Sequence, residues 1–140
     1  MADDVTILAV DDSASIRKLV ELTLRREGYA VVTAGSGLAA LAAVAQHRPS
    51  LVLLDVMLVA LDGFQLCRAL RANPELADLP IVMLTGRESA ADRATGEAAG
   101  VSAYLTKPFR PEELLTVVRA QLGCQDGIHS RVVSEMGIVS

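Results

Sequence analysis

The chain has 140 residues, of which 51% are apolar, and this length suits one domain with a buried core. Aromatic residues make up only 3% and Trp is absent, so we expect the core to consist of Ala, Leu, Val and Ile. The net charge of −4 and the lack of a Lys/Arg-rich block argue against a domain that binds nucleic acid through its phosphates.

The first apolar run, residues 5–10, predicts a strand, and a helix is expected over residues 14–27. Ser13 is a favourable N-cap residue for this helix, and Gly28 lies just past its end. Apolar residues recur in the helix at the spacing of one helical face, at Ile16, Leu19, Val20 and Leu24.

The next two strands are expected over residues 29–33 and 51–54, on either side of a second helix. Ser36 can cap that helix, whose apolar positions are Leu38, Leu41, Ala42 and Ala45. The run at 51–54 is apolar at every position, which suits a strand that is covered on both faces of a sheet.

The second half of the chain continues the alternation of strands and helices. We expect a helix over 63–72, a strand over 81–84, a helix over 90–99, a strand over 103–105 and a helix over 111–122. Asn73-Pro74 ends the first of these helices, Ser89 can cap the second, and Pro111 suits the first turn of the last.

The helix expected over 90–99 has only small residues at the positions that we expect to be buried, which are Ala90, Ala91, Ala94 and Ala98. Gly96 lies in its interior, where glycine costs roughly 1 kcal/mol relative to alanine. Small side chains bury little apolar area, so this helix is either held loosely or is an ordinary alanine-rich surface helix.

Five strand–helix pairs in succession predict an α/β fold with a parallel sheet, right-handed crossovers and helices on both faces. In such sheets the functional crevice lies at the carboxyl ends of the strands. Polar residues follow the predicted strands at that edge, namely Asp11, Asp12, Asp55, Thr85 and Lys107.

The three carboxylates of this set are expected to repel one another. At an effective dielectric constant of ~20, one pair of carboxylates ~4 Å apart costs about 4 kcal/mol. A hard divalent cation relieves this repulsion, and ligands that are all oxygen suit Mg²⁺. Asp11 or Asp12 taken alone could instead serve as a cap for the first helix, but that role does not explain the whole cluster.

Four segments resemble the receiver domain of two-component response regulators, including the chemotaxis regulators. They read VDDSASIRKLV at 10–20, LVLLDVMLVALDGFQL at 51–66, IVMLTGR at 81–87 and AYLTKPF at 103–109. The resemblance covers about residues 5–122 and implies a flavodoxin-like receiver fold, with five parallel strands in the order 2-1-3-4-5.

The resemblance implies that Asp55 is the phosphoacceptor and that Asp11 and Asp12 form the acidic pair of the metal site. Mg²⁺ would be held by Asp12, Asp55 and the backbone carbonyl of Met57, with Asp11 reaching it through water.

The same resemblance implies that Lys107 offsets charge on the phosphoryl group and that the Lys107–Pro108 bond is cis. Thr85 corresponds to the switch hydroxyl and Tyr104 to the switch aromatic residue. The signalling surface would consist of the helix at 90–99, the strand at 103–105 and the helix at 111–122.

The implied function is a signalling domain that accepts a phosphoryl group from a sensor histidine kinase or a phosphotransfer protein and then contacts a downstream protein. The domain would be no enzyme beyond its own phosphoryl transfer and slow dephosphorylation. We expect residues 1–123 to form the receiver domain and residues 124–140 to be a C-terminal tail or a truncated linker.

An alternative is a receiver module truncated from a larger transcription factor or output enzyme. The residues DVML at 55–58 resemble the winged-helix transcription class. That class has an acidic pair where this chain has Ser102-Ala103, and an Arg where it has Val117.

Two positions near the site bear on how long the phosphoryl group survives. Met57 and Arg87, each two residues after a site residue, border the path of attacking water, and Met57 cannot orient water. We therefore expect slow loss of the phosphoryl group. Val59 stands where the family usually has Pro, while Asp62-Gly63 at the start of the next helix is intact.

No run of 18 apolar residues occurs and the N-terminus is acidic, so we expect a cytoplasmic protein without a membrane span, as a monomer or weak dimer. Cys67 and Cys124 lack the spacing of metal ligands and are expected to be free thiols.

Two rival functions are disfavoured by single positions. A haloacid-dehalogenase type of enzyme needs a second Asp two residues after its nucleophile, where this chain has Met57. A flavodoxin-like cofactor binder needs a phosphate loop rich in hydroxyl groups and glycine after the first strand, where Asp11-Asp12 would repel phosphate unless a metal intervened.

Overall fold

The computed structural model describes residues 5–57, 63–86 and 90–125, and these residues form the α/β fold that the sequence predicts. All strands of the sheet are parallel, in the order β2-β1-β3-β4-β5. The strands are β1 Thr6–Val10, β2 Ala30–Ala34, β3 Leu51–Asp55, β4 Ile81–Thr85 and β5 Ala103–Thr106.

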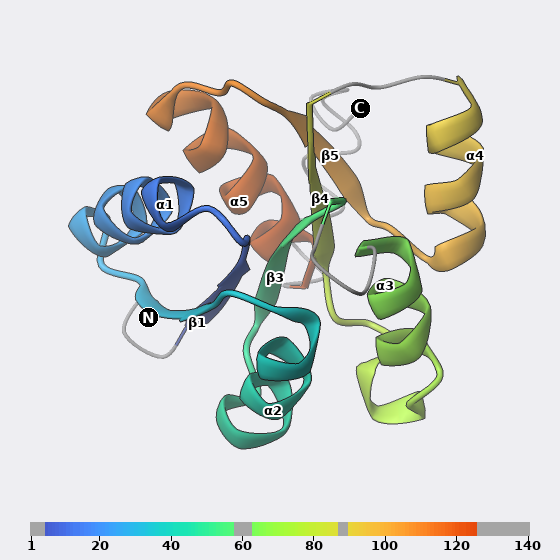
Figure 1. The fold of residues 1–140 in the computed structure, drawn as a ribbon. Helices are drawn as coiled ribbons and strands as arrows, with labels where there is room; N and C mark the ends of the chain where they lie inside the picture. The colour runs from blue at the N-terminus through green and yellow to red at the C-terminus, as the bar shows by residue number, and fades with distance from the viewer. Residues whose placement is uncertain (1–4, 58–62, 87–89, 126–140) are drawn as a thin grey trace.

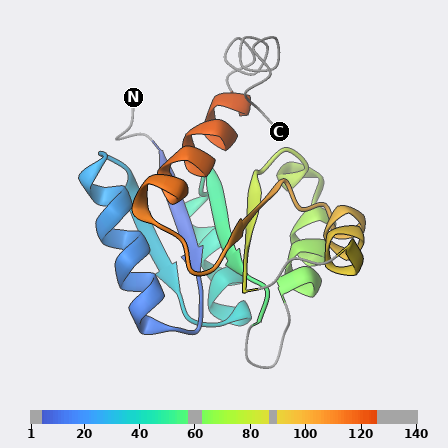
Figure 2. The same cartoon turned by 90° about the horizontal axis from the view of Figure 1, so that it is seen from above.

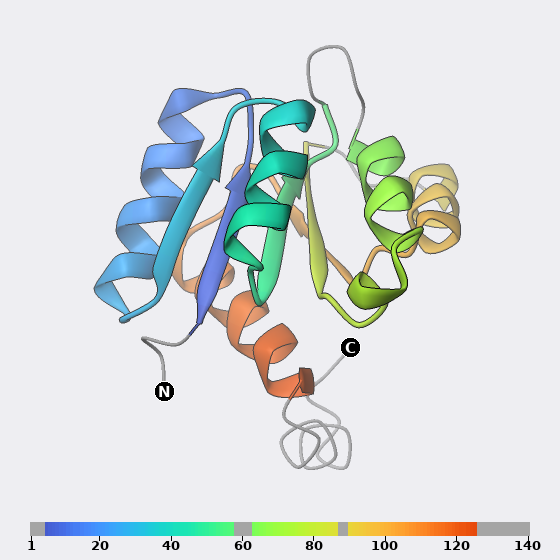
Figure 3. The same ribbon diagram turned by 90° about the horizontal axis from the view of Figure 1, so that it is seen from below.

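Helices cover both faces of this sheet (Figure 1). They are α1 Ala14–Arg26, α2 Gly37–His47, α3 Gly63–Arg71, α4 Ala90–Ala99 and α5 Pro111–Gln125, with a short 3-10 helix, η2, at Pro74–Leu76. Helices α1 and α5 lie on one face, in front in Figure 2, and α2, α3 and α4 lie on the other, in front in Figure 3. Within the described ranges, no helix is long and apolar enough to cross a membrane.

The predicted N-caps of α1 and α2 are confirmed. The hydroxyl of Ser13 accepts a hydrogen bond from the backbone N–H of Ile16 at 3.3 Å, and the hydroxyl of Ser36 accepts one from Ala39 at 3.1 Å. Gly28 follows α1 with a φ of 92°, a conformation that glycine adopts without strain.

The two central strands, β3 and β4, are buried along their whole length because each of their faces packs against helices. Leu54 and Met83 point into the core beneath α2 and α3, whereas Leu53 and Leu84 point into the core beneath α1 and α5. Each strand ends in one polar residue, Asp55 or Thr85, so the apolar pattern that builds the core also delivers these side chains to the carboxyl edge.

The apolar positions that mark α2 in the sequence do not face the sheet. The Leu38 side chain is 80% exposed and Leu41 is 38% exposed. The buried side of α2 consists instead of smaller residues, Ala40, Ala43 and Val44, which let the helix approach the sheet closely. Because α2 is apolar nearly all round, its periodicity alone could not select the buried side.

The expected buried face of α4 is wrong where the structure describes it. Ala94 and Ala98 are exposed and Ala99 is buried, while the side chains of Ala90 and Ala91 lie outside the described residues. The thiol of Cys67, a free cysteine as predicted, donates to the carbonyl of Ala99 at 3.2 Å. This hydrogen bond joins α3 to the end of α4 at the side where Ala99 is buried.

Gly63 is needed where α3 begins against the end of β3. Its backbone N–H donates to the carbonyl of Val56 at 2.8 Å. A Cβ atom at Gly63 would overlap the backbone carbonyl oxygen of Asp55 and would lie 2.9 Å from Val56 Cα. These neighbours are backbone atoms next to the candidate site, so the clash cannot be relieved by a side-chain rotation.

We therefore expect Gly63→Ala to lower the free energy of unfolding by about 1–3 kcal/mol, the usual cost of overpacking. Gly86→Ala is the matched control, because no atom of the described residues lies within 4 Å of its added Cβ. Urea denaturation of both variants measures the difference. Equal losses in the two variants would show that the contact between Gly63 and β3 is unimportant.

Candidate active site

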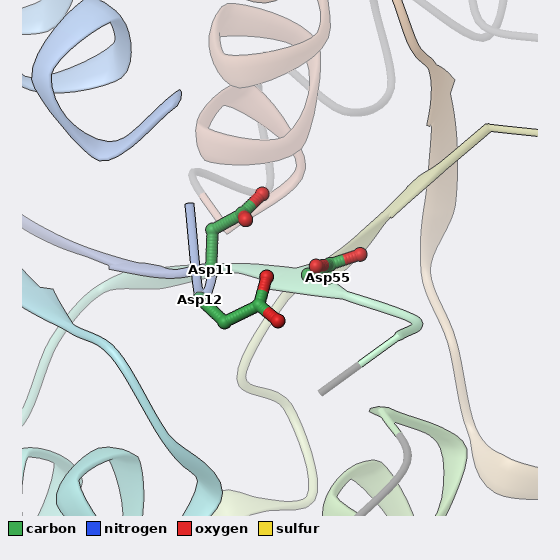
Figure 4. A group of neighbouring side chains, drawn as sticks. All are labelled: Asp11, Asp12 and Asp55. Carbon is green, nitrogen blue, oxygen red and sulfur yellow. The ribbon is translucent and has the colours of Figure 1, made fainter. Parts of the chain in front are cut away.

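Three carboxylates meet at the carboxyl edge of the sheet, as the strand ends predicted (Figure 4). Asp11 and Asp12 follow β1, and Asp55 is the last residue of β3. Each offers an oxygen atom within 4.8 Å of the others. Asp11 and Asp55 are buried and Asp12 is exposed, so the cluster has one side open to solvent.

The ammonium group of Lys107 lies between the two buried carboxylates. Its Nζ donates to Asp11 Oδ2 at 2.7 Å and lies 3.4 Å from Asp55 Oδ1. The backbone N–H of Lys107 donates to the carbonyl of Thr85 at 2.6 Å, which joins the ends of β5 and β4. The predicted cis peptide bond between Lys107 and Pro108 is confirmed.

Hydrogen bonds hold both the side chain and the backbone of Asp11. Its Oδ1 accepts a hydrogen bond from the backbone N–H of Ser13 at 2.9 Å, and its backbone N–H donates to Ala34 at 3.1 Å. Its carbonyl oxygen accepts one from Arg17 Nη1 at 2.6 Å. These contacts fix the loop that also carries Asp12.

Arg17 is a site residue that the sequence analysis missed. Gly35 leaves room for this side chain, because a Cβ at position 35 would lie 3.0 Å from Arg17 Nη1. The guanidinium group therefore uses space that any larger residue at position 35 would fill. From sequence alone, Arg17 is an ordinary cation on the first helix.

Burial raises the pKa of Asp55 above its ordinary value of 3.8, and the nearby charge of Asp11 acts in the same direction. The N–H of Met57, which donates to Asp55 Oδ1 at 3.1 Å, lowers this pKa, as does Lys107. The effects that raise the pKa of Asp55 outweigh those that lower it, so the ionised carboxylate is unfavourable in the folded protein. A bound cation would relieve that cost.

The pKa of Lys107 is also raised above its ordinary value, although burial by itself would lower it. Burial is the largest single effect, but the hydrogen bonds to Asp11 and Asp55 and the charges of these two carboxylates together outweigh it. The side chain therefore carries its positive charge throughout the neutral pH range.

An all-oxygen donor set such as this one fits a hard divalent cation, and Mg²⁺ in particular takes a few carboxylates and keeps several waters. Both oxygens of Asp11 already accept hydrogen bonds, Oδ2 from Lys107 and Oδ1 from the backbone N–H of Ser13. Met57, whose backbone carbonyl was predicted as a further ligand, follows β3 with its side chain 75% exposed.

The two predicted switch residues lie on neighbouring strands. Thr85 ends β4 and is buried, one position past the residue that pairs with Asp55. Tyr104, in β5 opposite Met83, is half-buried and packs against the core beneath α2 and α3. The predicted positions Val59 and Arg87 lie outside the described residues.

Comparisons with known proteins agree with the fold described above. A family model described as the response regulator receiver domain matches residues 7–119. The chemotaxis response regulator CheY4 of Vibrio cholerae has a solved structure that superposes with a TM-score of 0.80 at 38% identity. The superposition covers 84% of this chain and 98% of that one.

Curated relatives are longer than this chain. The DNA-binding response regulator MtrA of Mycolicibacterium paratuberculosis is 42% identical over 128 residues, which are 91% of this chain and 56% of MtrA. Response regulator MprA of Mycobacterium leprae is 47% identical over 116 residues, 83% of this chain and 50% of MprA. The chain thus spans about half the length of the curated relatives that it matches.

Replacing Asp55 by Asn should raise the free energy of unfolding at neutral pH in the absence of divalent cations, by on the order of 1 kcal/mol. The pKa of Asp55 is raised in the folded protein, so its ionisation costs stability only as the pH rises above 3.8. The gain in unfolding free energy of Asp55→Asn should therefore be complete above the raised pKa of Asp55 and should vanish as the pH falls below 3.8.

Lys107→Met should have the opposite effect and lower stability by about 1–3 kcal/mol, because it leaves the buried carboxylate of Asp11 without its cation. Asp78→Asn, at an exposed position, is the control and should change little. Urea titrations across pH in EDTA measure all three variants. A loss of stability in Asp55→Asn would contradict the electrostatic account.

Proposed function

The chain belongs to the response regulator receiver domain family, and on that premise we propose that Asp55 accepts a phosphoryl group from a phosphohistidine donor. The observation that supports this most directly is the position of Lys107, 3.4 Å from Asp55 at the carboxyl edge of the sheet. A fixed positive charge beside a buried carboxylate suits a group that must accept a dianionic substituent.

In the proposed reaction, a carboxylate oxygen of Asp55 attacks phosphorus and the P–N bond of the phosphohistidine breaks. The departing imidazole nitrogen keeps the electron pair and takes up a proton. Lys107 offsets negative charge on the transferring group from a position already fixed by Asp11 and Thr85. Mg²⁺, held by Asp12, Asp55 and the Met57 carbonyl with Asp11 through water, would supply further positive charge when bound.

The acyl phosphate adds roughly −1.5 to −2 charges at Asp55. We propose that the Thr85 hydroxyl then bonds a phosphoryl oxygen and that Tyr104 turns inward, which alters the surface formed by α4, β5 and α5. The short hydrogen bond from the Lys107 backbone to Thr85 supports this coupling, because it ties the two strand ends together.

The partners proposed are a sensor histidine kinase or phosphotransfer protein as donor and a downstream protein as target, in the cytoplasm, with the chain as a monomer or weak dimer. Residues 1–123 would be the receiver and 124–140 a tail or linker. The alternative, a receiver that forms part of a larger transcription factor or output enzyme, is supported by the length of the relatives.

Incubation with acetyl phosphate or phosphoramidate and Mg²⁺ should add one phosphoryl group, detected by intact mass. Asp55→Asn should remove this labelling, and Asp12→Ala should abolish the Mg²⁺-dependent labelling. Asp78→Asn, an exposed position, is the control and should be labelled like the wild type. Full labelling of Asp55→Asn would exclude Asp55 as the acceptor.

We also propose that the phosphoryl group is lost slowly, because the exposed thioether of Met57 borders the approach of water but cannot orient it. Met57→Asn should shorten the lifetime of the phosphorylated protein several-fold, as measured by the decay of the phosphorylated mass after removal of the donor. Met57→Leu should keep the wild-type rate. An unchanged lifetime in Met57→Asn would refute control of water access by this side chain.

A further inference from the structure

The outward face of α2 is unusually apolar for a surface helix. Leu38, Leu41, Ala42 and Ala45 are all exposed, and their spacing places them on one side of the helix. Single exposed leucines are common on soluble proteins. Four apolar side chains in one stripe are less common, because contiguous apolar patches usually mark a surface that another segment or molecule covers.

A groove of about 1080 Å³ adjoins this stripe. Leu41, Val44 and Ala45 of α2 form one wall, and Leu70, Leu76 and Leu79 of α3 and the following turn form the other. The groove also reaches Pro49 and Pro80, which precede β3 and β4. It therefore lies at the amino edge of the sheet, opposite the edge that carries Asp55.

Helix α5 ends beside this groove. Gln121, near the end of α5, is one of the lining residues although α5 covers the other face of the sheet. Figure 3 shows α5 running toward the edge where the strands begin. The helix ends at Gln125, about 6 Å farther along its axis. The chain that follows α5 thus starts next to the groove.

Residues 126–140 have a composition that suits the groove. Apolar residues are distributed along the segment, at Ile128, Val132, Met136 and Val139. The segment also carries Arg131 and Glu135, and the groove carries charges of both signs at Arg48, Glu75 and Asp78. Fifteen residues can extend to about 50 Å, so the segment can reach the whole groove.

From these observations we propose that residues 126–140 fold back and bind in the groove between α2 and α3, covering the apolar stripe of α2. A segment joined to α5 has a millimolar effective concentration at a site it can reach, so weak contacts are enough to keep it bound. A separate partner or a second copy of the chain would have to compete with this intramolecular contact. The proposal does not depend on phosphorylation of Asp55.

Hydrogen exchange of the full chain, followed by mass spectrometry, tests the proposal. Peptides from 126–140 should exchange several-fold more slowly than the rate for an unstructured chain, at every protein concentration. Leu41→Asp should bring them to the unstructured rate. Leu22→Asp, a change at another exposed leucine on α1, is the matched control and should leave their protection intact.

A tail variant, Val132→Asp with Met136→Asp, checks the contact from the other side and leaves the core untouched. It should speed exchange in α2 peptides without altering peptides from α1. Unstructured exchange of 126–140 in the wild-type chain would overturn the proposal, as would equal effects of Leu41→Asp and Leu22→Asp. Protection that grows with protein concentration would also overturn it, in favour of a second copy of the chain.

Discussion

The ion pair between Lys107 and Asp11 is the interaction on which the rest of the site depends. It fixes the ammonium group 2.7 Å from a carboxylate that is almost completely buried, and it leaves that group 3.4 Å from Asp55. Without this cation, two buried carboxylates would face each other across the edge of the sheet. Lys107 compensates the negative charge of Asp11. Asp55 still lacks a full counter-charge, and its pKa is raised.

The rest of the fold keeps this arrangement in place. Apolar strands with helices on both faces bring Asp55 and Thr85, which are the last buried residues of β3 and β4, to one edge of the sheet. Backbone contacts complete the frame, since Lys107 is tied to Thr85, and Asp11 to Ala34 and Arg17. The site is thus assembled from strand ends and loop backbone, and its one exposed carboxylate, Asp12, leaves it open to a cation from solvent.

The sequence was sufficient for most of this arrangement because its signals are local. Apolar runs that end in Asp or Thr located the strand ends, and Ser13 and Ser36 located two helix starts. The orientation of α2 and α4 could not be predicted, because helices rich in alanine offer no distinct apolar side. Arg17 was missed since its role comes from a contact with Asp11 and from space beside Gly35, which only the folded chain reveals.

The most direct test of the central claim is a crystal structure of the protein with Mg²⁺ and beryllofluoride, which mimics a phosphoryl group on a carboxylate. The account predicts beryllium on Asp55, within reach of the Lys107 ammonium, and Mg²⁺ bound by Asp12 and Asp55. Beryllium bonded to Asp11 or Asp12, or a metal bound away from these three carboxylates, would contradict it.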